Sequence, residues 1–143
     1  MLRIFKSKDS SDDVKGYAAY YLGILYTPEA VFTSEVVDTL ASQMTLNLPR
    51  GGHLSIDESQ WRMWPVVGAL VNIGTPSIPA MIRNVSTSDD AEVVKLSLQV
   101  LCRIDGDKDI VRLRLQKALE KEPDKTKQTR LQTALTALET VKF

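Results

Sequence analysis

Apolar residues recur at helical spacing along nearly the whole chain, and this pattern limits the fold more than any other feature of the sequence. In seven segments they stand three or four residues apart, which places them on one face of an α-helix. Strand signals are sparse, because no run alternates Val, Ile or Thr with polar residues. The pattern therefore predicts an all-α fold with short loops. The expected helices span 14–26, 34–44, 61–73, 78–85, 91–104, 110–119 and 131–141.

Residues that break or cap helices stand between these segments. The segment Ser88-Asp89-Asp90 offers N-caps, and Asp105-Gly106-Asp107 is typical of a tight turn. Pro65 lies inside the expected helix 61–73, where it either marks the true start or kinks the helix. Three other prolines lie at expected helix starts, where a missing N–H is harmless. These are Pro28, Pro76 and Pro79.

The chain contains a weak internal repeat. Leu22–Pro28 aligns with Leu70–Pro76 at an offset of 48, and Leu70–Ile73 aligns with Leu101–Ile104 at an offset of 31. A long loop near 45–59 nearly accounts for the difference between the offsets. The repeating unit is therefore expected to be an antiparallel helix pair of about 31–34 residues, with one insertion. Each pair has an apolar face that it buries by stacking on its neighbours.

The segment Gly68–Ile82 resembles the HEAT and HEAT-like helical repeat pattern. In that pattern the first helix ends in Ala-Leu-x-x-Ile-Gly, a Thr-Pro turn follows, and the second helix opens with Ile-Pro-x-Met-Ile. Leu96–Val111 is similar, with Asp105-Gly106 in place of Gly-Asp, and Tyr17–Val31 is similar with Tyr26 in place of the glycine. The resemblance implies an armadillo-type α–α superhelix. It implies no catalytic residues, because the family shares none.

From the repeat and the resemblance we expect an α-solenoid of three to four antiparallel helix pairs with a C-terminal capping helix. The expected boundaries are an N-terminal tail 1–13, a helical repeat domain 14–143, repeat units of about 14–45, 60–86 and 89–121, an insertion loop 46–59 and a cap 126–142.

The last and first helices of the expected domain differ. The last helix has one apolar stripe and an opposite polar face, as a terminal cap requires. The stripe consists of Leu131, Ala134, Leu135, Leu138 and Val141, and the polar face consists of Gln128, Gln132, Thr136 and Thr140. The first helix is instead apolar all round, with only Lys15 charged between Val14 and Tyr26.

A helix that is apolar all round is expected to be covered on both sides. One interpretation is that Leu2, Ile4 and Phe5 fold back over it, or that the tyrosine hydroxyls reach water. The other is that a second chain docks there, as a homodimer or as a different partner. The residues of this possible contact face are Tyr17, Tyr20 and Tyr21.

Composition excludes several classes of function. The chain has 143 residues, with 18 Lys and Arg against 18 Asp and Glu, so we expect no general binding to nucleic acid. One Cys forms neither an internal disulfide nor a zinc thiolate cage. The first eight residues lack the apolar core of a secretory signal, and no run of 18 apolar residues occurs. We therefore expect a cytoplasmic protein without a membrane span.

The residues that could carry chemistry form no recognisable catalytic set. We expect Cys102 to be a small buried apolar residue rather than a reactive thiol, and His53 to be a solvated loop residue. Asp57-Glu58 and Asp89-Asp90 are typical of acidic first turns of helices, with catalytic carboxylates as the alternative. Trp61 and Trp64 are expected in the core, with an aromatic ligand wall as the alternative. We expect no catalytic residue, no cofactor and no metal.

Charge is distributed unevenly along the chain. Residues 29–60 contain one Arg and five acidic residues, whereas 108–130 contain eight basic and four acidic residues. In superhelices of the resembled kind, the second helix of each pair lines the concave face. A groove that is acidic at one end and basic at the other would orient a protein ligand, and an ordinary solvated surface is the alternative. The expected outward residues are Glu35, Asp38, Arg83, Asn84, Arg112 and Gln116.

The expected function is a non-catalytic protein–protein interaction module or scaffold that presents a concave helical surface. Its partner is another protein or a second copy of the chain. One alternative is an enzyme, because some HEAT-like proteins resemble bilin lyases or DNA glycosylases. A glycosylase would need a basic concave face, which the acidic first repeat opposes. The other alternative is a nucleic-acid-associated scaffold that uses the basic segment 108–130.

Overall fold

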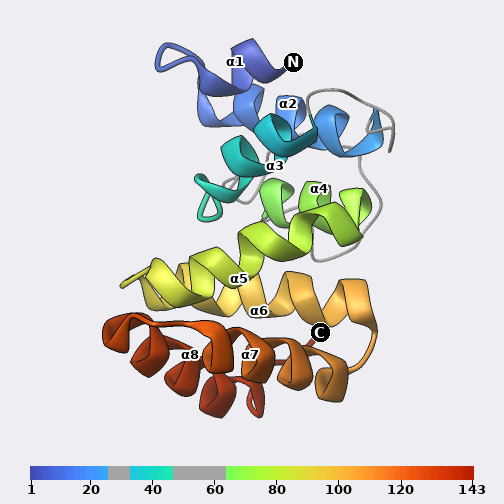
Figure 1. The fold of residues 1–143 in the computed structure, drawn as a ribbon. Helices are drawn as coiled ribbons and strands as arrows, with labels where there is room; N and C mark the ends of the chain where they lie inside the picture. The colour runs from blue at the N-terminus through green and yellow to red at the C-terminus, as the bar shows by residue number, and fades with distance from the viewer. Residues whose placement is uncertain (26–32, 47–63) are drawn as a thin grey trace. The chain divides into compact units, whose positions relative to one another are not determined.

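The computed structural model describes residues 1–25, 33–46 and 64–143. These residues form helices and no strand, which confirms the all-α prediction (Figure 1). Most of the predicted insertion loop 46–59 lies outside the described residues, as do Tyr26, His53 and Trp61. The helices are α1 (Leu2–Lys6), α2 (Asp12–Ile24), α3 (Thr33–Ala41), α4 (Pro65–Ile73), the 3-10 turn η2 (Thr75–Ser77), α5 (Ile78–Thr87), α6 (Ala91–Asp105), α7 (Lys108–Lys121) and α8 (Lys125–Leu138).

Local capping interactions define several helix ends. Asp90 accepts a hydrogen bond from the Glu92 backbone N–H at 2.8 Å and caps α6. Pro65 marks the start of α4 rather than a kink, since Trp64 is the N-cap. Gly74 ends α4 and Gly106 ends α6, with φ of 78° and 70°. These positive φ angles favour glycine, because a side chain would be strained there.

The chain divides into two compact units, Met1–Ser77 and Ile78–Phe143. The first contains α1 to α4 and η2, and the second contains α5 to α8. The boundary lies inside the segment 60–86, which the repeat pattern predicts as one helix pair. Each unit has its own buried apolar residues.

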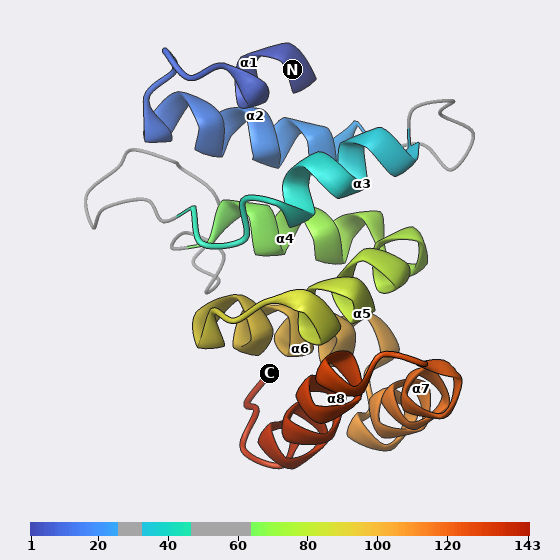
Figure 2. The ribbon, with the colours of Figure 1, turned by 60° about the vertical axis from the view of Figure 1, so that its left-hand side comes forward.

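In the first unit, α2 packs along α4 through small residues (Figure 2). Gly16, Ala19 and Gly23 are buried and share one face of α2. A Cβ atom on Gly23 would lie 2.7 Å from the Cα atom of Ala69, so the two helices approach too closely for a larger residue. Small side chains at this contact bring the two backbones together.

The expected tail 1–13 is partly helical in the structure. Residues 2–6 form α1, which packs on α2. Phe5 is fully buried, whereas Ile4 remains exposed. Of the three residues Leu2, Ile4 and Phe5, which one interpretation places over the first predicted helix, Phe5 is buried, Leu2 is half-buried and Ile4 is exposed. Burial of a large aromatic side chain offsets the weak intrinsic stability of a five-residue helix.

In the second unit, each helix contacts its two neighbours in the cycle α5–α6–α7–α8 (Figure 1). The last helix closes this cycle because it packs on both α5 and α7. The stripe predicted for the last helix is buried at four positions, and Leu135 is half-buried. The buried side chains of the unit include Met81, Val85, Leu96, Leu98, Leu101, Val111, Leu115, Leu131 and Leu138.

Among the described residues, no single helix is long and apolar enough to cross a membrane. The segments Pro65–Ile73 and Thr75–Thr87 reach the required length and hydropathy only when they are taken together as a bent pair.

Candidate binding surfaces

Large apolar side chains of α2 face outward. Tyr17, Tyr21 and Ile24 are 39%, 44% and 50% exposed, and Val14 and Leu25 are exposed as well. These five residues, which we name the α2 row, lie within one helical face at spacings of three or four residues. Tyr20 is half-buried, and its ring contacts that of Tyr21 edge-on at 5.5 Å between centroids. Of the three predicted contact tyrosines, two are therefore exposed and one is partly covered.

The two acidic residues of the predicted concave row lie on α3. Glu35 and Asp38 are both exposed. Lys6 of α1 donates a hydrogen bond to Glu35 at 2.6 Å, so this carboxylate already has a cation beside it. The pair links α1 to α3. Both side chains are about half exposed, where an ion pair contributes little to stability.

The remaining four residues of the predicted row lie in the second unit. Arg83 on α5 and Gln116 on α7 are exposed, and Asn84 and Arg112 are half-buried. The structure thus divides the predicted row between the two units. Within the second unit, α8 packs on both α5 and α7, the helices that carry these four residues.

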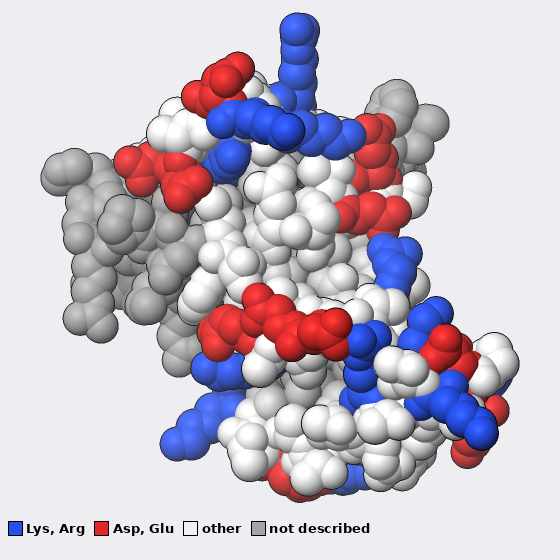
Figure 3. Space-filling view, turned by 90° about the vertical axis from the view of Figure 1, so that its left-hand side faces the viewer, with Lys and Arg blue, Asp and Glu red and all other residues white. Residues whose placement is uncertain are grey.

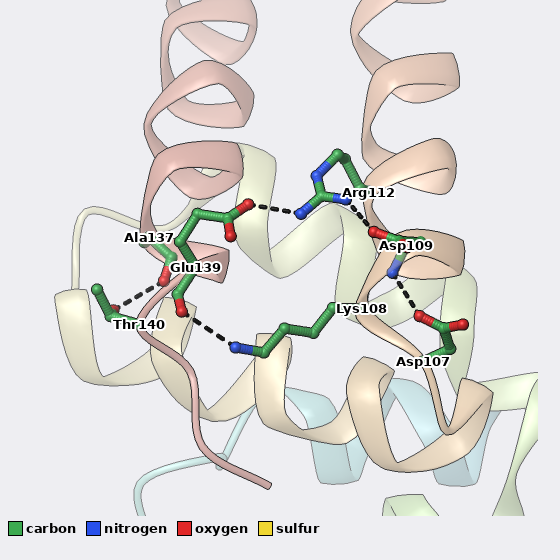
Figure 4. A network of polar contacts seen from close by, with 7 residues as sticks. All are labelled: Asp107, Lys108, Asp109, Arg112, Ala137, Glu139 and Thr140. Carbon is green, nitrogen blue, oxygen red and sulfur yellow. Dashed lines mark hydrogen bonds and ion pairs between the residues drawn. The ribbon is translucent and has the colours of Figure 1, made fainter.

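Arg112 belongs to a polar network that joins α7 to the end of α8 (Figure 4). It donates hydrogen bonds to Glu139 at 2.6 Å and to Asp109. Lys108 donates to the backbone carbonyl of Glu139 at 3.0 Å. The pKa of Arg112 is raised, first by the hydrogen bond to Glu139 and then by that to Asp109. The sequence predicted an outward binding residue, but the guanidinium is engaged in contacts within the fold.

The basic segment 108–130 is partly neutralised by acidic residues outside it. Arg114 donates two hydrogen bonds to Asp105, at 2.8 and 2.9 Å, and Arg130 pairs with Asp89. Glu139, paired with Arg112, also lies outside the segment. On the face drawn in Figure 3, Lys and Arg side chains are interspersed with Asp and Glu. This arrangement disfavours the nucleic-acid alternative, which needs an uncompensated basic surface.

The cysteine of the chain lies in the core. Cys102 is fully buried, and burial raises the pKa of its thiol to about 11, with smaller and opposing effects of Lys108 and Asp105. A thiol with this pKa is a poor nucleophile near neutral pH. In the part of the chain that the structure describes, no group of three or more His, Cys, Asp or Glu side chains could hold a metal ion. Asp89, expected in an acidic first turn, directly precedes the N-cap Asp90 of α6 and also pairs with Arg130.

A cavity of about 570 Å³ lies between α6 and α8, and the sequence did not predict it. We name it the α6–α8 groove. Its apolar lining includes Val94 and Leu98 of α6, Ala134 and Ala137 of α8, and Val141 just beyond α8. The groove escapes sequence analysis because its two walls are about 40 residues apart in the chain.

The ends of the groove are marked by two polar contacts. At one end Arg130 pairs with Asp89, and at the other the Gln99 side chain donates to the backbone carbonyl of Lys142 at 3.3 Å. Both walls therefore run in the same direction, because their earlier residues meet at one end and their later residues at the other.

A scan against protein-family models gives no match for this chain. Searches of the curated proteins and of the solved structures give none either. The function is therefore argued from the surfaces described above.

Proposed function

We propose that the chain is a non-catalytic protein-binding module that uses the α2 row as its contact surface. The observation that carries the proposal is the exposure of Tyr17, Tyr21 and Ile24 on a helix whose Gly and Ala residues are buried. A contiguous exposed apolar patch is typical of a protein interface. Tyrosine is common at interfaces because it supplies a large apolar area and a polar tip.

The bound partner is another protein or a second copy of this chain. A second copy would form a symmetric dimer in which the α2 rows of two chains face each other, since identical surfaces meet across a twofold axis. The adjacent residues Asp12 and Asp13 would lie at the edge of such an interface, where they remain solvated.

We also propose that the helices form HEAT-like repeats stacked as an α-solenoid of three to four pairs, with α8 as the cap. Two observations support this architecture. Both α4 and α6 end at a glycine with positive φ, as expected for equivalent first helices. In addition, α2 packs on α4, as first helices of successive pairs do. A crystal structure in which α2, α4 and α6 fail to superpose as equivalent first helices would contradict the proposal.

The contact surface is tested by affinity capture from the native source, with cross-linking and mass spectrometry. Tyr21→Glu places a charge within the α2 row, and we expect it to remove the specific partner. Leu113→Glu is the matched control, because Leu113 is an exposed apolar residue, 57% accessible, on α7. Light scattering at several concentrations identifies the homodimer, whose mass should fall to that of a monomer in Tyr21→Glu alone.

Circular dichroism of both variants checks that the helical fold is retained. Partners or dimers that persist in Tyr21→Glu and disappear in Leu113→Glu would refute the assignment of the α2 row.

A further inference from the structure

The α6–α8 groove has a more apolar interior than its composition indicates. Thr129 and Thr133 line it, but each hydroxyl donates to the backbone carbonyl four residues earlier, at 3.0 Å. Thr140, also in the lining, donates to the Ala137 carbonyl at 2.9 Å. Because their hydroxyls are bonded to the helix backbone, these threonines contribute mainly their methyl groups to the groove.

The floor of the groove is apolar. Val85, Leu98 and Ala134 line it and are buried, with Leu98 only 1% exposed. The volume of about 570 Å³ lies within the range of about 300–1,000 Å³ that is typical of small-molecule sites. These features favour an aliphatic occupant.

The length and the closed ends of the groove favour a short occupant. Ala91 and Gln99 of the α6 wall are separated by about 12 Å at the usual rise of 1.5 Å per residue. Arg130 with Asp89 crosses one end, and Gln99 with the Lys142 carbonyl crosses the other. A partner helix that runs through the groove would meet these contacts, whereas an acyl-type chain fits between them.

The rim carries more positive than negative charge. Lys95, Arg130 and Lys142 line the groove together with one acidic residue, Asp89. The Asp89 carboxylate is paired with Arg130, which leaves Lys95 and Lys142 as the excess. Lys95 stands midway along the α6 wall, one helical turn after Ala91 and one before Gln99, whose side chain contacts the Lys142 carbonyl. The Glu92 carboxylate lies 3.8 Å from the Lys95 ammonium group.

We propose that the α6–α8 groove binds a small anionic amphiphile, an aliphatic chain with one carboxylate, whose head group lies near Lys95 and Lys142. The chain would displace water from the apolar floor, and the carboxylate would be stabilised by the two ammonium groups. This site is in the second unit, so the test of the α2 row neither supports nor contradicts it.

The proposal is tested by isothermal titration calorimetry with sodium decanoate, kept below the concentration at which it forms micelles. We expect one decanoate to bind per chain. Thr133→Trp fills the groove and should weaken binding by roughly tenfold or more, because the indole occupies volume that the aliphatic chain needs. Thr136→Trp is the matched control: Thr136 is also exposed on α8 and donates to the carbonyl four residues earlier, but it does not line the groove.

The head-group assignment is tested with decanol and with the double variant Lys95→Gln, Lys142→Gln. Decanoate should bind the wild-type chain more tightly than decanol, and the double variant should weaken decanoate about fivefold while leaving decanol unchanged. Equal binding of decanol and decanoate would overturn the anionic assignment. Absence of decanoate binding, or equal loss in Thr133→Trp and Thr136→Trp, would overturn the site. A captured partner protein that Thr133→Trp removes, without decanoate binding, would replace it with a peptide site.

Discussion

Asp105 combines two roles at the end of α6. Its side chain is only 7% exposed, and it accepts both hydrogen bonds that Arg114 donates from the next helix. Burial is the largest cause of the raised pKa of the neighbouring Cys102 thiol, and the negative charge of Asp105 raises it further. A two-pronged pair of this kind fixes the orientation of the guanidinium as well as its position. The pair of Arg114 and Asp105 thus joins α6 to α7 more firmly than a fully exposed ion pair would.

The buried thiol leads to a prediction at the residue scale. Cys102 should react slowly with a disulfide reagent at pH 8 in the folded protein, because only the thiolate attacks and its pKa is about 11. In urea the thiol is exposed and its pKa returns toward the ordinary 9.0, so labelling should be rapid. The measurement is the rate of thiolate release followed by absorbance. Rapid stoichiometric labelling of the native protein would show that the thiol is accessible.

At the scale of elements, α2 reverses the usual distribution of side chains on a helix. Its small residues are buried against the rest of the unit, whereas Tyr17, Tyr21 and Ile24 face outward. The cause is the close approach of α4, since only a residue without a Cβ fits at Gly23 beside Ala69. The large apolar side chains are therefore left on the opposite face, where they form the α2 row.

This packing predicts the effect of a minimal substitution in α2. Gly23→Ala should lower the free energy of unfolding by about 1–3 kcal/mol, because the new methyl overlaps the Ala69 backbone. The sign is informative, since alanine would otherwise stabilise a helix by about 1 kcal/mol relative to glycine. Urea denaturation followed by circular dichroism measures the change. Gln132→Ala, on the exposed face of α8, is the control and should have little effect; a stabilised Gly23→Ala variant would contradict the close contact.

At the scale of the whole molecule, the division at Ser77 and Ile78 separates two sets of packed helices. In the second set, contacts distant in sequence close the arrangement: Arg130 pairs with Asp89, and Arg112 pairs with Glu139. The first joins the connection between α5 and α6 to α8, and the second joins α7 to the end of α8. Together with the cyclic packing of α5 to α8, they indicate that the unit contains most of the interactions that stabilise it.

We therefore expect the fragment 78–143 to fold when expressed alone. It should show helical circular dichroism and a single cooperative unfolding transition, with lower stability than the full chain because a small domain buries a smaller fraction of its surface. Thermal denaturation of the fragment and the full chain makes the comparison. A fragment without a cooperative transition would show that the unit depends on the remainder of the chain.

The sequence by itself determined the fold class and many of the helix ends. Apolar spacing and capping residues act within a few positions of the chain, so Asp90 and Gly106 could be assigned from their neighbours alone, whereas the structure decided that Pro65 starts a helix rather than kinking one. The apolar stripe of the last helix was predicted for the same reason. The protein-binding function and the HEAT-like stacking remain predictions, because they concern partners and arrangements that local patterns do not contain.

Only the tertiary structure decided which faces are free and which charges are paired. The sequence predicted Arg112 as an outward-facing binding residue, but its guanidinium donates a hydrogen bond to Glu139, 27 residues later. Phe5 lies in the expected tail, and the structure decided that it folds back, as one of the two interpretations has it, by showing it buried where α1 packs on α2. The α6–α8 groove likewise exists only because α8 returns alongside α6. In each case the physical reason is the same: the deciding contact joins residues that are distant in the chain, and its free energy depends on packing rather than on local sequence.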